Sequence, residues 1–238
     1  MNLVENTKHL MVGTGAAWVL WLLILLSVVS FAIMFERGYV FLTRREDLET
    51  LRDHLSKALR SGGFVEARGA MRKSKHPAAA VALRGMRREE TETSPAEAEE
   101  AMAAETTAQR ILLDSNLAFL GTLGANAPFI GLLGTVIGIV QAFDELGKAA
   151  HAPAANAAQA AAAAAPQAVM SSLSEALVAT AAGIFVAIPA IVAFNVFQRA
   201  TKTALAGADV LSRELLAFLH SDKTALAAGK GRAPAGDD

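Results

Sequence analysis

Two hydroxyls and one carboxylate are the side chains of this chain that could handle ions inside a membrane. Thr135 and Thr180 lie in long apolar stretches without a charged residue, and Glu175 stands directly before the second stretch. These stretches are Ser115–Phe143 and Ala176–Gln198. Polar groups at membrane depth cost free energy unless they find partners, so they usually face a bundle interior, a cavity or a partner helix. The three residues therefore indicate a polar pathway between helices.

Each of these side chains also has a simpler explanation. The Thr135 hydroxyl could donate to the carbonyl oxygen four residues earlier in its own helix. Glu175 stands near the end of its span and could lie in the interfacial region. A self-sufficient proton pathway would need ionisable groups deep in the bilayer, and neither apolar stretch contains one. If ions cross here, a partner protein must supply the deep carboxylate.

The composition is that of a small membrane protein. Of its 238 residues, 53% are hydrophobic and 19% are charged, and the net charge is −1. The chain has no cysteine, which excludes disulfides, thiolate metal sites and cysteine catalysis. There is no basic excess to indicate nucleic-acid binding, and no cluster of His and Asp suggests an active site. We therefore expect no enzymatic activity, no metal and no cofactor.

Three segments are apolar enough to span a membrane, because a spanning helix needs about 20 mainly apolar residues. The first, Gly13–Phe35, lacks a cleavage pattern and is predicted to be an uncleaved anchor. Basic residues lie at one end of each span. The first span is followed by Arg37, Arg44, Arg45 and Arg52, the second is preceded by Arg110, and the third is followed by Arg199, Lys202 and Arg213. By the positive-inside rule, the N-terminus is extracytoplasmic and the C-terminus is cytoplasmic.

The expected fold is an all-α membrane protein with long cytoplasmic helical extensions. Its expected segments are an extracytoplasmic lead-in 1–15, a first span 16–36, a cytoplasmic helical region 37–114, a second span 115–147, an extracytoplasmic Ala-rich loop 148–168, a third span 169–199, a cytoplasmic helix 200–221 and a disordered tail 222–238. Within the Ala-rich loop, the high helix propensity of alanine leaves a short helix as the alternative.

Local signals predict several helix ends. Ser94–Glu97 is a capping box that should begin a helix, and we expect that helix to run unbroken into the second span as far as Lys148. Gly62–Gly63 should end the helix that begins near Leu48, and a short helix is expected over Pro77–Arg88. Pro166 should begin the third long helix.

Small residues and prolines mark the second and third spans. Gly131, Gly134 and Gly138 in the second span and Gly183 in the third have the character of helix-packing positions, because small side chains let helices approach closely. Pro128 and Pro189 are expected to kink their helices gently.

Two motifs of these spans resemble those of one known family. Asn126–Ile139 resembles the second-span signature of the MotA/TolQ/ExbB proton-channel family. Ser174–Ile184, followed by Ala187–Ala190, is similar to the family's third-span signature. The layout of three spans resembles ExbB and TolQ rather than MotA, which has four.

The resemblance implies a homopentameric ring in the bacterial inner membrane, with the third and second spans lining a central pore. An ExbD- or TolR-like dimer of single-span chains would occupy the pore and supply a membrane aspartate. Thr135 and Thr180 would form the polar ring that faces this aspartate, and Glu175 would lie at the outer end of the pathway. Proton flow would then drive rotation of the inner dimer and transmit force to a periplasmic machine.

The resemblance leaves the driven machine open. The Ala-rich stretch Ala149–Ala165 is longer than is typical of ExbB or TolQ, so a gliding-motor stator remains an alternative to an uptake or envelope motor. Two other classes also remain: a non-conducting membrane scaffold, for which the glycines suffice, and a passive channel subunit.

Overall fold

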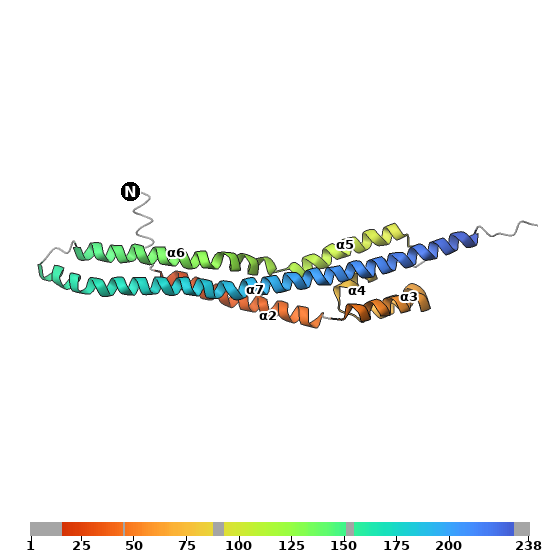
Figure 1. Ribbon diagram of the computed structural model, residues 1–238, viewed down its shortest axis with the longest axis horizontal. Coiled ribbons are helices and arrows are strands. Elements are labelled where there is room, and N and C mark those ends of the chain that lie inside the picture. The colour runs from red at the N-terminus through yellow and green to blue at the C-terminus, as the bar shows by residue number, and fades with distance from the viewer. Residues whose placement is uncertain (1–15, 45, 88–92, 151–154, 231–238) are drawn as a thin grey trace, which may run out of the picture. The chain divides into compact units, whose positions relative to one another are not determined.

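The described residues are helical and contain no strand (Figure 1). The computed structural model describes residues 16–44, 46–87, 93–150 and 155–230. Its helices are α2 (Ala17–Thr43), α3 (Leu48–Met71), α4 (Pro77–Gly85), α5 (Pro95–Asp114), α6 (Leu117–Ala150) and α7 (Ala155–Lys230). The predicted all-α class is confirmed, whereas the expected lead-in 1–15 and the end of the chain from residue 231 lie outside the described residues.

The chain forms two compact units. The first unit contains residues up to Glu36 and Asn116–Asn195, and the second contains Arg37–Ser115 and the residues from Val196 onward. Helices α2 and α7 therefore contribute residues to both units. Within the described part of the chain, three helices are long and apolar enough to cross a membrane: Ala17–Thr43, Leu117–Ala150 and Ala163–Ser221. This finding confirms the three predicted spans.

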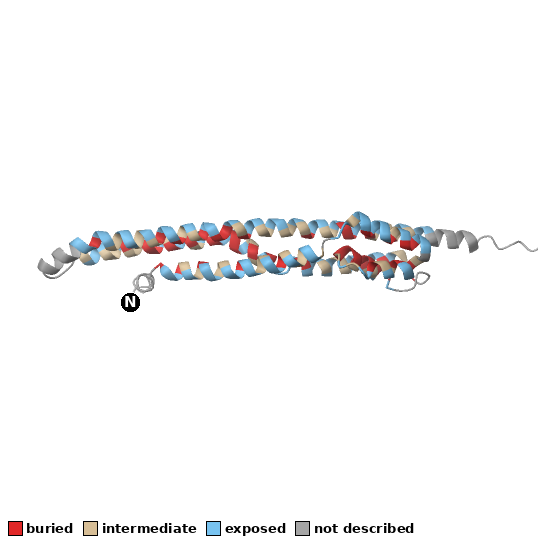
Figure 2. Ribbon diagram, turned by 90° about the horizontal axis from the view of Figure 1, so that it is seen from below, coloured by how far each residue is buried: buried red, intermediate tan, exposed pale blue. Residues whose placement is uncertain are grey.

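In the first unit, α2, α6 and α7 lie side by side around a small apolar core (Figure 1). Buried residues form a stripe along one side of α7 (Figure 2). The core consists of Val19 and Leu23 from α2, Leu123, Ala127 and Ile137 from α6, and Val186, Ala187 and Ala190 from α7, with Ala16 preceding α2. Large side chains such as Phe129 and Phe185 are exposed, as expected for helices that face lipid.

In the second unit, the core gathers one face of each contributing helix. The leucines of α3 that recur at helical spacing, Leu51, Leu55 and Leu59, are buried together with Leu211, Leu215 and Leu219 of α7. Burial of this stripe, which follows the period of 3.6 residues, is what stabilises an amphipathic helix in water. Helices α4 and α5 complete the core with Ala78, Ala82, Ala98 and Met102.

The start of α5 follows its sequence signal. The Glu97 backbone N–H donates to Ser94 Oγ at 3.1 Å, and the Ser94 N–H donates to the Glu97 carboxylate at 3.5 Å. The capping box is therefore present with Pro95 at the first helical position, where the missing proline N–H has no intrahelical partner to lose.

The expected continuous helix from Ser94 to Lys148 is wrong. Helix α5 ends at Asp114 and α6 begins at Leu117. Asn116 between them has a φ of 61°, the left-handed region that asparagine adopts more readily than most residues. Short polar side chains such as those of Asp114 and Ser115 also compete with helical hydrogen bonds. These local preferences outweigh the helix propensity of the flanking residues.

Side chains of α2 contact both sides of this break. In the second unit, buried Arg37 donates from its guanidinium to the Leu112 carbonyl oxygen at 3.1 Å. This carbonyl belongs to the last turn of α5, where helical carbonyls lack backbone partners. In the first unit, the Asn116 side-chain amide donates to the Glu36 carboxylate at 3.3 Å. Neighbouring residues of α2 thus stabilise the end of one helix and the residue before the next.

Three further helix limits differ from expectation. Most of the expected loop 148–168 is helical, because α6 continues to Ala150 and α7 begins at Ala155 and includes Pro166. Alanine has the highest helix propensity, and it dominates this stretch. The tail expected to be disordered from residue 222 is helical to Lys230. Helix α3 continues past the predicted stop to Met71, with Gly63 at a φ of 59°.

The start of α4 depends on the neutral form of a histidine. His76 Nδ1 accepts a hydrogen bond from the Ala78 N–H at 3.1 Å, and a protonated ring could not accept it. Burial lowers the pKa of His76 below its ordinary value of 6.5, and the nearby Glu46 carboxylate opposes this shift. The unfolded chain therefore binds more protons than the folded one just below pH 6.5.

We expect α4 to lose stability as the pH falls below this value. Amide protection of α4 in hydrogen exchange, corrected for the intrinsic rate, should decrease between about pH 7.5 and about pH 5.5. His76→Asn keeps a capping oxygen but does not titrate, so this decrease should be absent in the variant. An equal decrease in both proteins would show that another group is responsible.

Candidate functional site

Helices α6 and α7 approach so closely that several glycines cannot be replaced without movement. A Cβ on Gly131 would lie 2.8 Å from the Ala179 carbonyl oxygen and 2.9 Å from Thr180 Cα. A Cβ on Gly183 would lie 2.6 Å from the Ala127 carbonyl oxygen. These are contacts with backbone, which cannot rotate away as a side chain can. One close approach of the two helices therefore occurs beside Thr180.

The same contact continues along α6. A Cβ on Gly134 would lie 2.7 Å from Ala179 Cβ, and one on Gly138 would collide with Ala176 Cβ. Both glycines are buried. The four selected glycines thus lie on the facing sides of α6 and α7, where small side chains permit close packing.

This close approach brings the Thr180 hydroxyl to the backbone of the other helix. Thr180 Oγ1 donates to the Gly131 carbonyl oxygen at 3.0 Å. Within α6, the same oxygen is the helical partner of the Thr135 backbone N–H. The carbonyl of Gly131 therefore accepts from both α6 and α7, and the two threonines lie on either side of one oxygen.

The Thr135 hydroxyl bonds within its own helix. Its Oγ1 donates to the Leu132 carbonyl oxygen at 2.7 Å, three residues earlier. The structure thus shows the simpler of the two explanations, a hydroxyl bonded within its own helix. The acceptor is three residues before Thr135, where four residues were expected. The residue is partly exposed.

Glu175 lies five residues before Thr180 on α7 and next to buried Ala176. Its side chain is partly exposed. Among the described residues it forms neither a hydrogen bond nor an ion pair. Its carboxylate is therefore available to water, an ion or another chain.

Pro128 and Pro189 lie inside α6 and α7. Pro128 has no N–H to donate to the Gly124 carbonyl, so this turn of α6 lacks one helical hydrogen bond. The Asn126 side-chain amide donates to the Thr122 carbonyl oxygen at 2.8 Å in the same region. The kinks expected at both prolines remain predictions.

Ser30 is another polar residue of this bundle, and its sequence context did not single it out. Ser30 of α2 is 2% exposed, and its hydroxyl has no hydrogen-bond partner among the described residues. Its burial could have been predicted from the sequence, because Ser30 continues the helical face of Val19 and Leu23. Serine is common enough in spanning helices that the type alone did not single it out.

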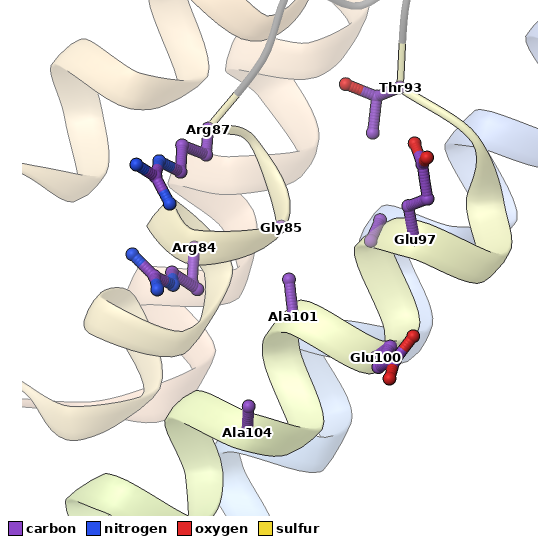
Figure 3. A pocket seen from close by; sticks show the side chains of 9 residues that line it. Arg84, Gly85, Arg87, Thr93, Glu97, Glu100, Ala101 and Ala104 are labelled. Carbon is purple, nitrogen blue, oxygen red and sulfur yellow. The ribbon is translucent and has the colours of Figure 1, made fainter.

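A separate pocket of about 360 Å³ lies in the second unit between α4 and α5. Figure 3 shows Arg84 and Arg87 on one side of it and Glu97 and Glu100 on the other. None of the residues selected from the sequence lines this pocket.

Comparison with known proteins shows which family shares the sequence motifs of α6 and α7. The sequence profile of the MotA/TolQ/ExbB proton channel family matches residues 73–208, more than half of the chain. The chain belongs to this family. The match includes α4, α5, α6 and the apolar part of α7, and so contains all of the selected threonines, glycines and prolines and Glu175. The resemblance inferred from the two motifs is thereby confirmed, and the chain is a multi-pass inner-membrane protein.

Among similar proteins, several are named ExbB and one is named TolQ. The biopolymer transport protein ExbB of Neisseria gonorrhoeae is 38% identical over 110 residues, which cover 46% of this chain and 44% of the relative. ExbB of Xanthomonas campestris pv. campestris (strain B100) is 38% identical over 118 residues, covering 50% and 42%. The Tol-Pal system protein TolQ of Pseudomonas aeruginosa is 28% identical over 232 residues, covering 92% and 95%. The similarity to the ExbB relatives thus spans less than half of their length.

Proposed function

We propose that this protein is a stator subunit that couples the proton-motive force to mechanical work in the cell envelope. Membership of the MotA/TolQ/ExbB proton channel family supports this function. The observation that carries it is the Thr180–Gly131 hydrogen bond, which lies at a close contact between α6 and α7. The Thr180 hydroxyl donates across to the neighbouring helix and keeps two acceptor lone pairs, which a polar pathway can use.

The hydroxyls suit a particular kind of partner group. Thr135 and Thr180 each donate their single hydroxyl hydrogen to a backbone carbonyl. A threonine hydroxyl has one donor and two acceptor lone pairs, so only lone pairs remain for a ligand. They can accept from a protonated carboxylic acid or from hydronium. This polarity suits a protonated partner aspartate as the group that carries the proton.

The proposed assembly is a homopentamer whose pore holds an ExbD/TolR-like dimer of single-span chains. The partner is required because the described spans offer no carboxylate near Thr135 or Thr180 other than Glu175 at one end. The N-terminus would be periplasmic and the C-terminus cytoplasmic, since basic residues follow the first and third spans. The subunit itself would have no enzymatic activity, metal or cofactor.

A non-conducting scaffold is the competing function. The glycine contacts of α6 and α7 would be sufficient for it. A measurement of proton movement distinguishes the stator from the scaffold. The complex purified with its co-expressed single-span partner and reconstituted into liposomes should carry protons in response to a potential, as measured by an enclosed pH-sensitive dye. Liposomes with this chain and its partner that remain tight to protons would support the scaffold.

Glu175→Ala should impair proton flux much more than folding. The unpaired carboxylate at the end of the pathway would raise the local proton concentration, so its removal should lower flux by about tenfold. The thermal stability of the complex should change little, because the side chain makes no described contact. Glu175→Gln should resemble the alanine variant if charge is the cause. Failure of either variant to insert or assemble would instead assign Glu175 a structural role.

A further inference from the structure

A second polar site lies in the second unit between α5 and α7. It is a pocket of about 370 Å³. Its lining residues that matter here are Thr106, Arg110 and Asp114 from α5 and Thr201, Lys202 and Asp209 from α7. Polar and charged side chains thus line a space large enough for several water molecules.

One of these side chains is buried without a hydrogen-bond partner among the described residues. Thr201 is 2% exposed, and its hydroxyl oxygen has no hydrogen-bond partner among the described residues. A buried hydroxyl without a partner costs about 1–3 kcal/mol, so it normally bonds to ordered water. Thr106 donates its own hydroxyl hydrogen to the Met102 carbonyl oxygen at 2.8 Å and offers only acceptors to the pocket. The lining is therefore arranged for water.

Four charged groups face this space without neutralising one another. Arg110, Asp114, Lys202 and Asp209 form no ion pair among the described residues. Each group is exposed. The two carboxylates are therefore open to water in the pocket.

The positions of these carboxylates in the chain are specific. Asp114 is the acidic residue immediately before the second span, and Asp209 is the first acidic residue after the third. Helices α5 and α7 bring them to one pocket. A proton that leaves the charge-free spans on this side would therefore meet these two carboxylates first along either helix.

We propose that this pocket is a hydrated proton-release site on the cytoplasmic side of the complex. The proposal rests on the proposed function. A hydronium ion that enters the pocket transfers its proton to a carboxylate of Asp114 or Asp209 and becomes water. The resulting carboxylic acid gives the proton to cytoplasmic water, which restores the carboxylate. Thr201 positions the water chain by hydrogen bonding.

The test is proton flux into dye-loaded liposomes that contain the complex with its co-expressed partner. The Asp114→Asn/Asp209→Asn double variant should lower flux by about tenfold. Glu99→Gln is the matched control, because Glu99 is exposed on α5 but does not line the pocket. Size-exclusion chromatography checks that each variant assembles.

Chemical rescue separates proton transfer from a structural effect. Imidazole on the cytoplasmic side should restore flux in the double variant, because a small buffer can accept the proton that the missing carboxylates would take. If the double variant assembles and has wild-type flux, the release site is wrong but the proposed function stands. The same holds if the flux is reduced and imidazole does not restore it. A wild-type complex that moves no protons would overturn the proposed function and the release site with it.

Discussion

Gly183→Ala is expected to destabilise the bundle of α2, α6 and α7 strongly. The new Cβ would lie 2.6 Å from the Ala127 carbonyl oxygen and 3.1 Å from Gly131 Cα. Both atoms are backbone, so α6 and α7 must move apart. Overpacking of this kind costs about 1–3 kcal/mol. Helix association in a membrane depends largely on such packing, so separation of the helices also removes favourable contacts along their length.

The measurement is the temperature at which the detergent-purified complex loses its size-exclusion peak. Gly147→Ala is the matched control, because a Cβ at Gly147 of α6 would meet nothing within 4 Å. We expect a clear loss for Gly183→Ala and none for the control. Equal thermal stability of the two variants would mean that α6 and α7 are not packed as closely as the structure shows.

Thr180→Val is expected to abolish proton-driven function while leaving the complex assembled. Valine preserves the shape of threonine but removes the hydroxyl. The Gly131 carbonyl keeps its helical partner, so the lost bond should cost only about 1 kcal/mol. Proton flux in liposomes should fall by at least about tenfold if the hydroxyl accepts from a protonated group in the pathway.

Two variants provide the comparison for Thr180→Val. Thr180→Ser keeps the hydroxyl and should retain most of the flux. Thr122→Val removes an exposed hydroxyl from the same bundle and should have no effect, since the Thr122 side chain makes no described hydrogen bond. Wild-type flux in Thr180→Val would contradict a polar pathway through α7 and favour the scaffold.

Features set by local chemistry could be predicted from the sequence. The three spans follow from long apolar runs, the start of α5 from the Ser94–Glu97 capping box, and the core face of α3 from leucines at helical spacing. Each of these depends on residues close together in the chain. The family was also recognisable, because its motifs are short and contiguous.

Features that depend on distant contacts or on competing propensities were not predictable. The break at Asn116 was missed because the flanking residues favour helix, whereas Arg37 and Glu36 of another helix stabilise it. The Ala-rich stretch was expected to be a loop on grounds of low complexity, although alanine strongly favours helix.

The bonding of Thr180 shows the same limit. Sequence alone placed its hydroxyl in an apolar span but could not show that it donates to Gly131, because the bond joins residues 49 positions apart. Its existence requires the close approach that the glycines permit. The candidate site is thus a product of packing between α6 and α7 rather than of either helix alone.

The subunit composition of the purified complex tests the central proposal most directly. The affinity-tagged chain, extracted in mild detergent with its co-purifying proteins, would be weighed by native mass spectrometry. The proposal predicts a homopentamer with a dimer of small single-span chains, each carrying an aspartate in its membrane segment. A monomer or dimer without such a partner would contradict the stator function and leave Thr135 and Thr180 as packing residues of a scaffold.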